Sequence, residues 1–394
     1  MNLHFPEFTW LTNHILCLIF LTILCTTSAE QIRADEVDKL LQVVAEVGPG
    51  GVGSSAARVA TDRLGQHGVA ILPQLLNAMD TPNFVAANWY RTVYERIVAG
   101  ESAKDRPAFP VEYLQEFVRD SERQGRLRAL VLRLLDKLTP GYRESILPGL
   151  IHDAHFRDDA VAFVLSRGDK AKADGDTQAA KRDFQAAFKY ARDVAHITRA
   201  ADRLKVIGVD VDIVEQMGFV TNWYLIGPFD APLRTGFDKV FPPETSVDLQ
   251  ASYVGKGERK IKWKLFHTDD RLGQVDLIRA ITSVKEAVGY AYAELDAPAD
   301  QELQLLCGAD DNLSVWLNGE KIFARRQWLN GTRLDRFAAP AFFKKGRNKL
   351  LVKICQGPQH KNPAVPNNWS MQLRFCDETG AAVGLRSALP KTDS

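Results

Sequence analysis

The spacing of apolar residues along the chain changes near residue 215. From about residue 35 to residue 206, apolar positions recur every three or four residues, as in Leu127–Leu138. This spacing is typical of helices that bury one face against their neighbours. Breakers such as Gly48–Gly51 and Thr139–Gly141 divide the region into about eight segments. We therefore expect an α-helical domain over residues 30–215, either α-solenoid-like or an irregular bundle.

After Gly218 the apolar spacing becomes two. In Lys260–Leu265 each lysine is followed by an apolar residue, and Trp369–Cys376 also alternates. Alternation of this kind predicts strands with one buried face. In Val315–Phe323 the dipeptide Asn-Gly separates two such runs, which predicts a hairpin with a type I′ turn. Short strands without a long helix predict an antiparallel β-sandwich, or jelly roll, over residues 218–386, followed by a tail at 387–394.

Composition and charge exclude several classes of protein. The 394 residues are 45% hydrophobic and 25% charged, as in ordinary folded domains, which excludes a disordered chain and a multi-span membrane protein. Fifty Lys and Arg stand against 49 Asp and Glu, so the formal net charge is +1. Because nucleic-acid binding requires a basic excess on one face, this balance gives no reason to expect a nucleic-acid partner.

The first 29 residues resemble a secretory leader. The apolar run Ile15–Thr26 is shorter than the roughly 20 residues that a membrane span requires, and small residues up to Ala29 suit a signal peptidase. We expect cleavage near Ala29, no membrane span in the mature chain, and a secreted or periplasmic location. An uncleaved anchor and a cytosolic protein are the alternatives, because the leader carries no Lys or Arg.

Three cysteines follow the leader: Cys307, Cys355 and Cys376. The odd number requires at least one thiol outside any intramolecular disulfide, and no spacing typical of a metal site is present. One disulfide, Cys355–Cys376, is possible because both residues share an alternation phase near the ends of late strands. Three buried free thiols are the other interpretation.

Three segments of the strand-rich region carry a family resemblance. They are NWYLIGPFD with GFDKVFPPE (residues 222–230 and 236–244), GADDNLSVWLNGEKIF (308–323) and FKKGRNKLLVKICQG (343–357). Together they resemble the β-sandwich modules of the PA14 and galactose-binding-like type in large secreted bacterial proteins. The resemblance implies a jelly roll, and often carbohydrate or cell-surface binding.

Two helical segments carry weaker resemblances. Ser54–Asp80 is similar to a HEAT-type hairpin, and Ala160–Leu204 is similar to a TPR-type hairpin. Neither shows a strict repeat period. Helical faces of this kind usually bind proteins, so the resemblance implies a protein partner, and a plain spacer or scaffold is the alternative.

Candidate ligand-binding residues lie in the turn before the hairpin. Asp310, Asp311 and Asn312 place three oxygen-bearing side chains in sequence. Such oxygens could hold Ca²⁺ or accept hydrogen bonds from sugar hydroxyls, although a turn capped by Asp and Asn explains them equally. No other metal or cofactor is expected.

Trp328 is the tryptophan most suited to stack on a sugar. It lies in the polar segment RRQWLNGTRLD, where Arg333 and Asp335 could orient a polar ligand. A flat indole suits the C–H face of a pyranose, whereas a plug of the hydrophobic core is the competing interpretation.

No nucleophile elbow or zinc-protease motif is present in the sequence. We therefore predict a secreted, non-catalytic binding protein whose sandwich recognises a carbohydrate or surface glycan and whose helices dock a protein. The alternatives are a scaffold that binds only proteins and a hydrolase of unrecognised type.

Overall fold

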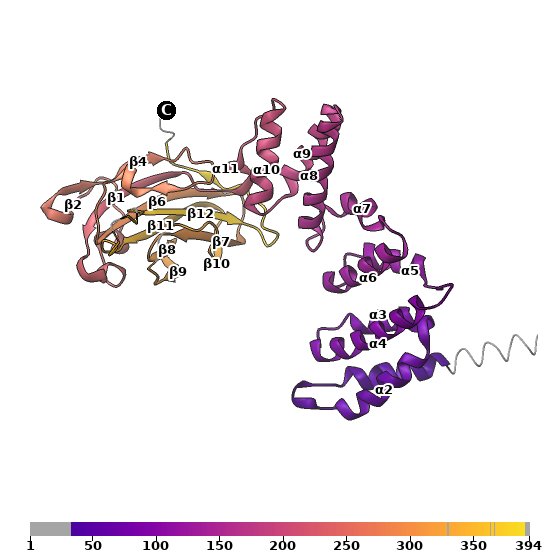
Figure 1. Cartoon of the computed structure of the whole chain (residues 1–394). Helices are drawn as coiled ribbons and strands as arrows, with labels where there is room; N and C mark the ends of the chain where they lie inside the picture. Colours follow the sequence, from indigo (N-terminus) through magenta and orange to yellow (C-terminus); the bar gives the residue numbers. More distant parts are fainter. Residues whose placement is uncertain (1–32, 329–330, 363, 366, 391–394) are drawn as a thin grey trace, which may run out of the picture. The chain divides into compact units, whose positions relative to one another are not determined.

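The computed structural model describes residues 33–328, 331–362, 364–365 and 367–390 (Figure 1). The predicted leader lies outside these residues. The chain divides into two compact units, Met1–Phe156 and Arg157–Ser394, here called the first unit and the sandwich unit. Among the described helices, none has the length and apolar character that crossing a membrane would require.

The first unit is entirely helical in its described part. After a helix at residues 33–45, its elements are η1 (Pro49–Gly51), α2 (Ser54–Gln66), η2 (Gly68–Ile71), α3 (Leu72–Met79), α4 (Phe84–Ser102), α5 (Val111–Arg119), α6 (Gly125–Leu138), α7 (Tyr142–Ile146) and η3 (Leu147–Leu150). The apolar stripes predicted from the sequence form one shared core, in which Leu64, Leu75 and Val131 are fully buried. Helix packing through these stripes explains why the three-to-four spacing persists through the region.

One buried ion pair closes the last turns of the first unit. Arg128 in α6 is 2% exposed, and its Nη1 donates to Asp153 Oδ2 at 2.6 Å. Arg128 Nε also donates to the Val118 carbonyl, and the guanidinium lies over the Phe156 ring. Asp153 caps its own loop by accepting the backbone N–H groups of His155 and Phe156. The pair therefore joins α6 to the loop that ends the unit.

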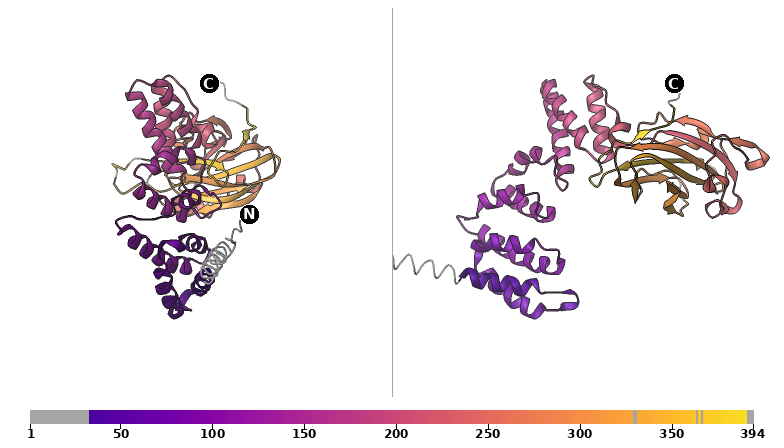
Figure 2. Two further views of the ribbon diagram at one scale, coloured as in Figure 1. Left: turned by 90° about the vertical axis from the view of Figure 1, so that its right-hand side faces the viewer. Right: turned by 180° about the vertical axis from the view of Figure 1, so that it is seen from behind.

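The sandwich unit begins with helices. These are α8 (Arg157–Ala173), α9 (Thr177–Tyr190), α10 (Val194–Val206) and α11 (Ile213–Met217). Small residues of α9, Ala180 and Ala187, favour close helix packing, and α8 meets α9 where a Cβ on Gly168 would lie only 2.6 Å from Phe184. Arg157 donates to the Thr379 carbonyl, and Arg271 pairs with Asp202, so these helices are tied to one end of the sandwich (Figure 2).

The strands of the sandwich unit follow α11. Its elements are β1 (Asn222–Asp230), η4 (Pro232–Phe237), α12 (Pro242–Thr245), β2 (Ser252–Val254), η5 (Lys256–Glu258), β3 (Lys260–Lys262), β4 (Lys264–His267), β5 (Val275–Asp276), α13 (Leu277–Ala280), β6 (Ala287–Ala297), β7 (Gln301–Ala309), β8 (Leu313–Leu317), β9 (Glu320–Arg325), β10 (Phe337–Phe343), β11 (Gly346–Gln356), β12 (Ser370–Cys376) and β13 (Arg386–Ser387).

Most of these strands form two stacked antiparallel sheets, and β2 and β3 pair separately as a hairpin. In the described residues the larger sheet has the order β4-β1-β6-β11-β8-β9, with β13 also paired to β6, and the smaller sheet has the order β10-β7-β12-β5. Alternate residues of both sheets, among them Trp223, Val352 and Phe375, form the core between them. The predicted fold class, helices followed by an antiparallel β-sandwich, is confirmed. The Asn-Gly turn is confirmed as well, since Asn318 and Gly319 have φ angles of 53° and 88°.

The larger sheet also buries its outer face. There Tyr290, Trp316 and Cys355 pack beneath the segment that contains η4, α12 and the β2–β3 hairpin. Within this outer cluster, Lys353 is 1% exposed and its Nζ donates to Glu244 Oε1 at 2.8 Å. The Lys353 ammonium also donates to the carbonyls of Phe237 and Lys239, and the Tyr290 hydroxyl donates to Glu244. This buried ion pair fastens α12 and the preceding loop onto the sheet.

The disulfide prediction is wrong. Cys307, Cys355 and Cys376 are buried free thiols. Cys355 lies in the larger sheet and belongs to its outer cluster, whereas Cys376 lies in the smaller sheet with its thiol near the Gln304 carbonyl. Cys355 and Cys376 share an alternation phase in the sequence, but this pattern does not specify whether their two strands belong to the same sheet. Burial raises the pKa of Cys307 and Cys355 to about 12, so both thiols stay protonated at neutral pH.

The change from helix to strand and the division between compact units fall at different places. Helices give way to strands between Met217 and Asn222. The division between the units lies at Phe156–Arg157, so α8 to α11 belong with the sandwich. The segments Ser54–Asp80 and Ala160–Leu204 form helical hairpins in the described structure. Their assignment to HEAT-type and TPR-type repeats stays a prediction.

Candidate functional site

The predicted residues before the hairpin lie at the end of the sandwich opposite α8 to α11, here called the loop end. Asp310, Asp311 and Asn312 are 4%, 5% and 0% exposed. Their side chains accept backbone N–H groups: Asp310 from Gly331, Asp311 from Gly357 at 2.7 Å, and Asn312 from Gln327 at 2.6 Å. These oxygens therefore hold distant loop segments in place, since their hydrogen-bond partners lie 15 to 46 residues away along the chain rather than within the turn.

Asp310 is in an environment that disfavours its charge. Burial raises the pKa of Asp310, while the Gly331 N–H and the nearby Lys285 act in the opposite direction. Asp310 and Asp311 each use one oxygen to accept a loop N–H group, and their use as Ca²⁺ ligands stays a prediction. Among the described residues, the group of His, Cys, Asp and Glu side chains close enough to share a metal ion is instead Asp158, Asp193 and His196, near the N-terminal ends of α8 and α10.

Trp328 is half-buried at the loop end. The guanidinium of Arg234 lies 4.7 Å from the centre of its ring, and a Cβ on Gly357 would lie 3.0 Å from the ring edge. Arg234 and the preceding Leu233 have positive φ angles of 62° and 54°, which shapes the loop that brings the guanidinium over the indole. Arg234 would have to swing away before this ring face could stack on a sugar.

Arg333 and Asp335 have separate roles in the described structure. The Arg333 carbonyl crosses so close to Gly308 that a Cβ there would lie 1.9 Å away, while the Arg333 side chain is exposed. Asp335 receives two hydrogen bonds from Arg374 Nε, at 2.9 and 3.1 Å, and Arg374 is 3% exposed. Asp335 therefore neutralises a buried arginine of the smaller sheet.

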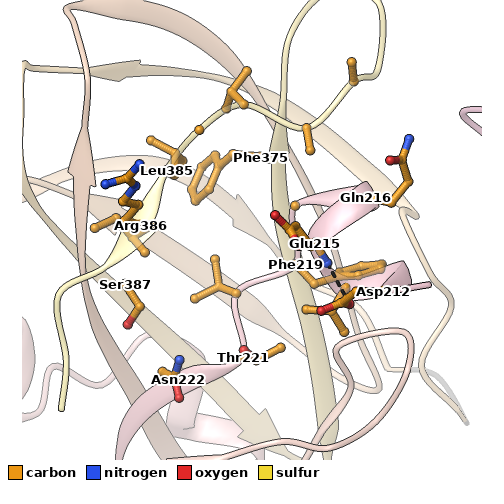
Figure 3. A pocket seen from close by; sticks show the side chains of 18 of the residues that line it. Asp212, Glu215, Gln216, Phe219, Thr221, Asn222, Phe375, Leu385, Arg386 and Ser387 are labelled. Carbon is orange, nitrogen blue, oxygen red and sulfur yellow. Dashed lines mark hydrogen bonds between the residues drawn. The ribbon is translucent and has the colours of Figure 1, made fainter. Parts of the chain in front are cut away.

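A groove lies at the other end of the sandwich, close to α11. Its volume is about 840 Å³, and it opens between α11, the start of β1 and the C-terminal segment 381–387. We call it the junction groove. Figure 3 shows Leu385, Arg386 and Ser387 on one side and the α11 residues Glu215 and Gln216 on the other.

The crossing of the chain between the two sheets forms the floor of this groove. The Val220 N–H donates to the Leu373 carbonyl of the smaller sheet, and two residues later Asn222 begins β1 of the larger sheet. Gly218 ends α11 with a φ of 75°, and a Cβ there would lie 2.8 Å from the Phe375 carbonyl. A glycine is therefore required where helix and sandwich meet.

The lining of the junction groove is amphiphilic. Val214, Val383 and Leu385, which are half-buried, provide apolar surface. Around them lie hydrogen-bonding groups: Ser387 is exposed, and the side-chain oxygen of Asn222 is fixed 2.9 Å from His267 Nδ1. Such a lining can bind a ligand that shows both C–H and hydroxyl surface.

Two carboxylates line the junction groove, and both belong to the five-residue helix α11. Asp212 is the N-cap of α11 and accepts the Glu215 N–H at 3.0 Å, and both side chains are exposed. Glycosidases place two carboxyl groups on either side of the bond that is cleaved. Asp212 and Glu215 instead lie side by side on one wall.

The predicted site and the junction groove share no residue. The change of apolar spacing places the domain boundary between residues 215 and 218, inside the groove lining, and residues 381–387 carry no motif. The signal that could have revealed the groove is weak: polar and apolar residues mix in VDIVEQMGFVTN, where neither helical nor strand periodicity continues.

Comparisons with known proteins find likeness only in structure. No family model matches the chain, and no curated protein matches it. The C-terminal β part shows distant structural similarity to a family 35 carbohydrate binding module from an environmental isolate. The identity is 11%, the match covers 28% of this chain and 78% of that chain, and the TM-score is 0.20.

Two glycoside hydrolases are similarly distant. A GH2 β-galacturonidase from Eisenbergiella tayi is 7% identical, with 40% of this chain and 25% of that chain covered and a TM-score of 0.22. A β-glucuronidase from Ruminococcus gnavus is 14% identical, with 41% and 28% covered and a TM-score of 0.25. The chain thus spans about a quarter of the length of these enzymes. At these identities and TM-scores the matches indicate only a distant likeness of the β-sandwich fold. The resemblance to PA14 modules stays a prediction.

Proposed function

We propose that this is a non-catalytic binding protein that holds a carbohydrate in the junction groove. The observation that carries the proposal is the amphiphilic lining, with Val214, Val383 and Leu385 as apolar surface and Asn222 and Ser387 as hydrogen-bonding groups. A sugar has the matching surface, because its ring presents C–H groups on its faces and hydroxyls along its edges. A volume of about 840 Å³ lies within the range of small-molecule sites.

The absence of catalysis is part of the proposal. Asp212 and Glu215 share one exposed helical turn, an arrangement suited to hydrogen bonding with hydroxyls rather than to acid–base work across a glycosidic bond. We expect a bound oligosaccharide to be recovered intact. Release of reducing ends from it, lost in a Glu215→Gln variant, would favour the hydrolase alternative.

The site can be tested on the full chain with a glycan array followed by calorimetry. Ser387→Trp places a bulky side chain in the groove from the exposed strand β13, and Ser252→Trp is a matched control because Ser252 is an exposed serine of the short strand β2. We expect Ser387→Trp to weaken binding by about tenfold or more, since displaced hydrogen bonds and contacts are worth at least 1.4 kcal/mol together. Ser252→Trp should leave affinity unchanged.

Two outcomes would overturn this assignment. If no glycan binds, the carbohydrate proposal fails. If Trp328→Ala abolishes binding while Ser387→Trp does not, the site lies at the loop end where the sequence predicted it. A Trp328→Ala variant that binds normally supports the junction groove.

Protein docking by the helical region and export of the chain belong to the same proposal. In the first unit, Val59 of α2 and Phe84 of α4 are 62% and 63% exposed, and a partner would cover such side chains. Export predicts that the mature protein begins near Glu30, which mass spectrometry of the native protein can determine.

A further inference from the structure

A second groove, on the edge of the larger sheet, is lined by cations. Its volume is about 410 Å³, and Arg259, Lys260, Lys262 and Lys264 line one side. The rest of its lining consists of Ile261, β1 residues 225–228 and residues 280–282 at the end of α13. We call it the basic groove.

The alternating sequence of β3 and β4 places these lysines together. Ile261 and Trp263, each 8% exposed, point into the outer cluster. The lysines between them are therefore exposed on the opposite side, about 7 Å apart along the chain as alternate residues of a strand are. The row follows from the same alternation that predicted the strands.

The charge of the basic groove is unbalanced. None of its lining residues is acidic. In the described part of the chain no ion pair involves these four cations, whereas the neighbouring Lys256 pairs with Asp230 at 2.5 Å. Like charges gathered in one groove repel each other and create a positive potential that attracts anions.

We propose that the basic groove binds an acidic polysaccharide through its carboxylate or sulfate groups. Successive lysines can each contact an anionic group of an extended polymer, and the half-buried Ile281 offers an aliphatic surface to its less polar face. This site is separate from the junction groove and does not depend on the function proposed there.

The lining favours a polysaccharide over a nucleic acid. Grooves that bind single-stranded nucleic acid combine positive charge with aromatic rings on which bases stack. The basic groove has no aromatic residue among those that line it. The chain as a whole also lacks the basic excess that duplex binding requires.

The experiment measures binding of the full chain to polygalacturonate, to its fully methyl-esterified neutral form, and to a single-stranded oligonucleotide. The test variant is K260Q/K262Q/K264Q, and the matched control is K344Q/K345Q/K361Q, which removes three exposed lysines elsewhere in the unit. Both variants change the formal net charge from +1 to −2, since each loses three of the 50 cations counted against 49 anions. Far-UV circular dichroism checks the fold of each.

We expect polygalacturonate to bind better than the neutral polymer and to bind less tightly as salt is added. The test variant should lose about tenfold in affinity, whereas the control should retain it, because local rather than net charge makes the site. Equal losses in both variants would show non-specific attraction and overturn the proposal. The proposal would also be overturned if the neutral polymer bound as tightly as polygalacturonate. It would be overturned, too, if the oligonucleotide bound more tightly than polygalacturonate and the test variant lost that binding.

Discussion

Both units pair cations with carboxylates, but the sandwich unit also contains a row of cations without such partners. On the helices of the first unit, arginines pair with carboxylates of the same or neighbouring helices, as in Arg63–Glu36, Arg91–Glu95 and Arg96–Asp62. In the sandwich unit the row from Arg259 to Lys264 lines a groove in which no residue is acidic. Cations that stabilise the fold form ion pairs with neighbouring carboxylates. The row from Arg259 to Lys264, for which the described structure shows no ion pair, is therefore where we expect an external anion to bind.

Each unit also contains a buried ion pair that fastens a loop or short helix, and the two pairs can be compared. Lys353 and Glu244 have side-chain exposures of 1% and 9%, and Arg128 and Asp153 have 3% and 10%. Both pairs attach an irregular segment to a regular element. The Lys353–Glu244 pair is the less exposed of the two. It also makes hydrogen bonds with the Phe237 and Lys239 carbonyls and the Tyr290 hydroxyl, so its loss should lower the free energy of unfolding more.

The largest effect is expected from Lys353→Met. Removal of the ammonium leaves Glu244 buried without its counter-ion, and the carbonyls of Phe237 and Lys239 lose their donor. The free energy of unfolding of the sandwich unit should fall by about 3–5 kcal/mol. The double variant Lys353→Met/Glu244→Gln, which removes the unpaired charge, should recover part of this loss. Urea unfolding would decide the point, and a loss below about 1 kcal/mol in the single variant would contradict the structural role.

A smaller, pH-dependent effect is expected from Asp153→Asn in the first unit. Burial acts to raise the pKa of Asp153, but the Arg128 hydrogen bond, the His155 and Phe156 N–H groups and the guanidinium charge outweigh it, so the pKa is lowered. The carboxylate therefore stabilises the fold above its ordinary pKa of 3.8, and this stability is lost as the pH falls through the lower folded value.

At pH 7 the Asp153→Asn variant should be less stable by about 1.5–3 kcal/mol, the usual contribution of a hydrogen bond to a charged group. The difference from the unsubstituted protein should shrink as the pH falls below 3.8. Urea unfolding of both proteins over a pH series measures it. A difference that stays constant down to pH 2 would show that Asp153 has an ordinary pKa.

Gly357→Ala tests how tightly the loop end is packed. The new methyl group would lie 2.9 Å from Asp311 Oδ2 and 3.0 Å from the Trp328 ring. Overpacking of this kind should destabilise the sandwich unit by about 1–3 kcal/mol. Gly384→Ala is the matched control, because nothing lies within 4 Å of its added Cβ. Equal thermal stability of the two variants would indicate that Trp328 moves freely and is available to a ligand.

The smallest effect is expected from Arg91→Ala. Arg91 and Glu95 are an exposed i,i+4 pair on α4, with side-chain exposures of 56% and 57%. Water and salt screen such a pair, so the first unit should lose no more than about 0.5 kcal/mol. A larger loss in thermal unfolding would mean that the surface pairs contribute more to the first unit than their exposure implies.

The secondary structure could be predicted from local sequence because it depends on periodicity. The stripe in Leu127–Leu138 became α6, the alternation in Trp369–Cys376 became β12, and Asn318-Gly319 became the turn of the β8–β9 hairpin. The candidate site could not be predicted in the same way. Asp310 and Trp328 were chosen for their chemistry, and the structure surrounds them with loop backbone and Arg234.

The sequence by itself determined which residues are helical, which alternate, and which side of each strand is apolar, because these properties depend on neighbours only a few positions away. Only the tertiary structure decided which distant segments meet. It brought residues 211–222 beside 381–387, separated Cys355 from Cys376 in two sheets, and placed the lysines of Lys260–Lys264 along a groove with β1 and α13. Such contacts arise from strand order and from the crossing of the chain between the sheets, and no local pattern encodes either of them.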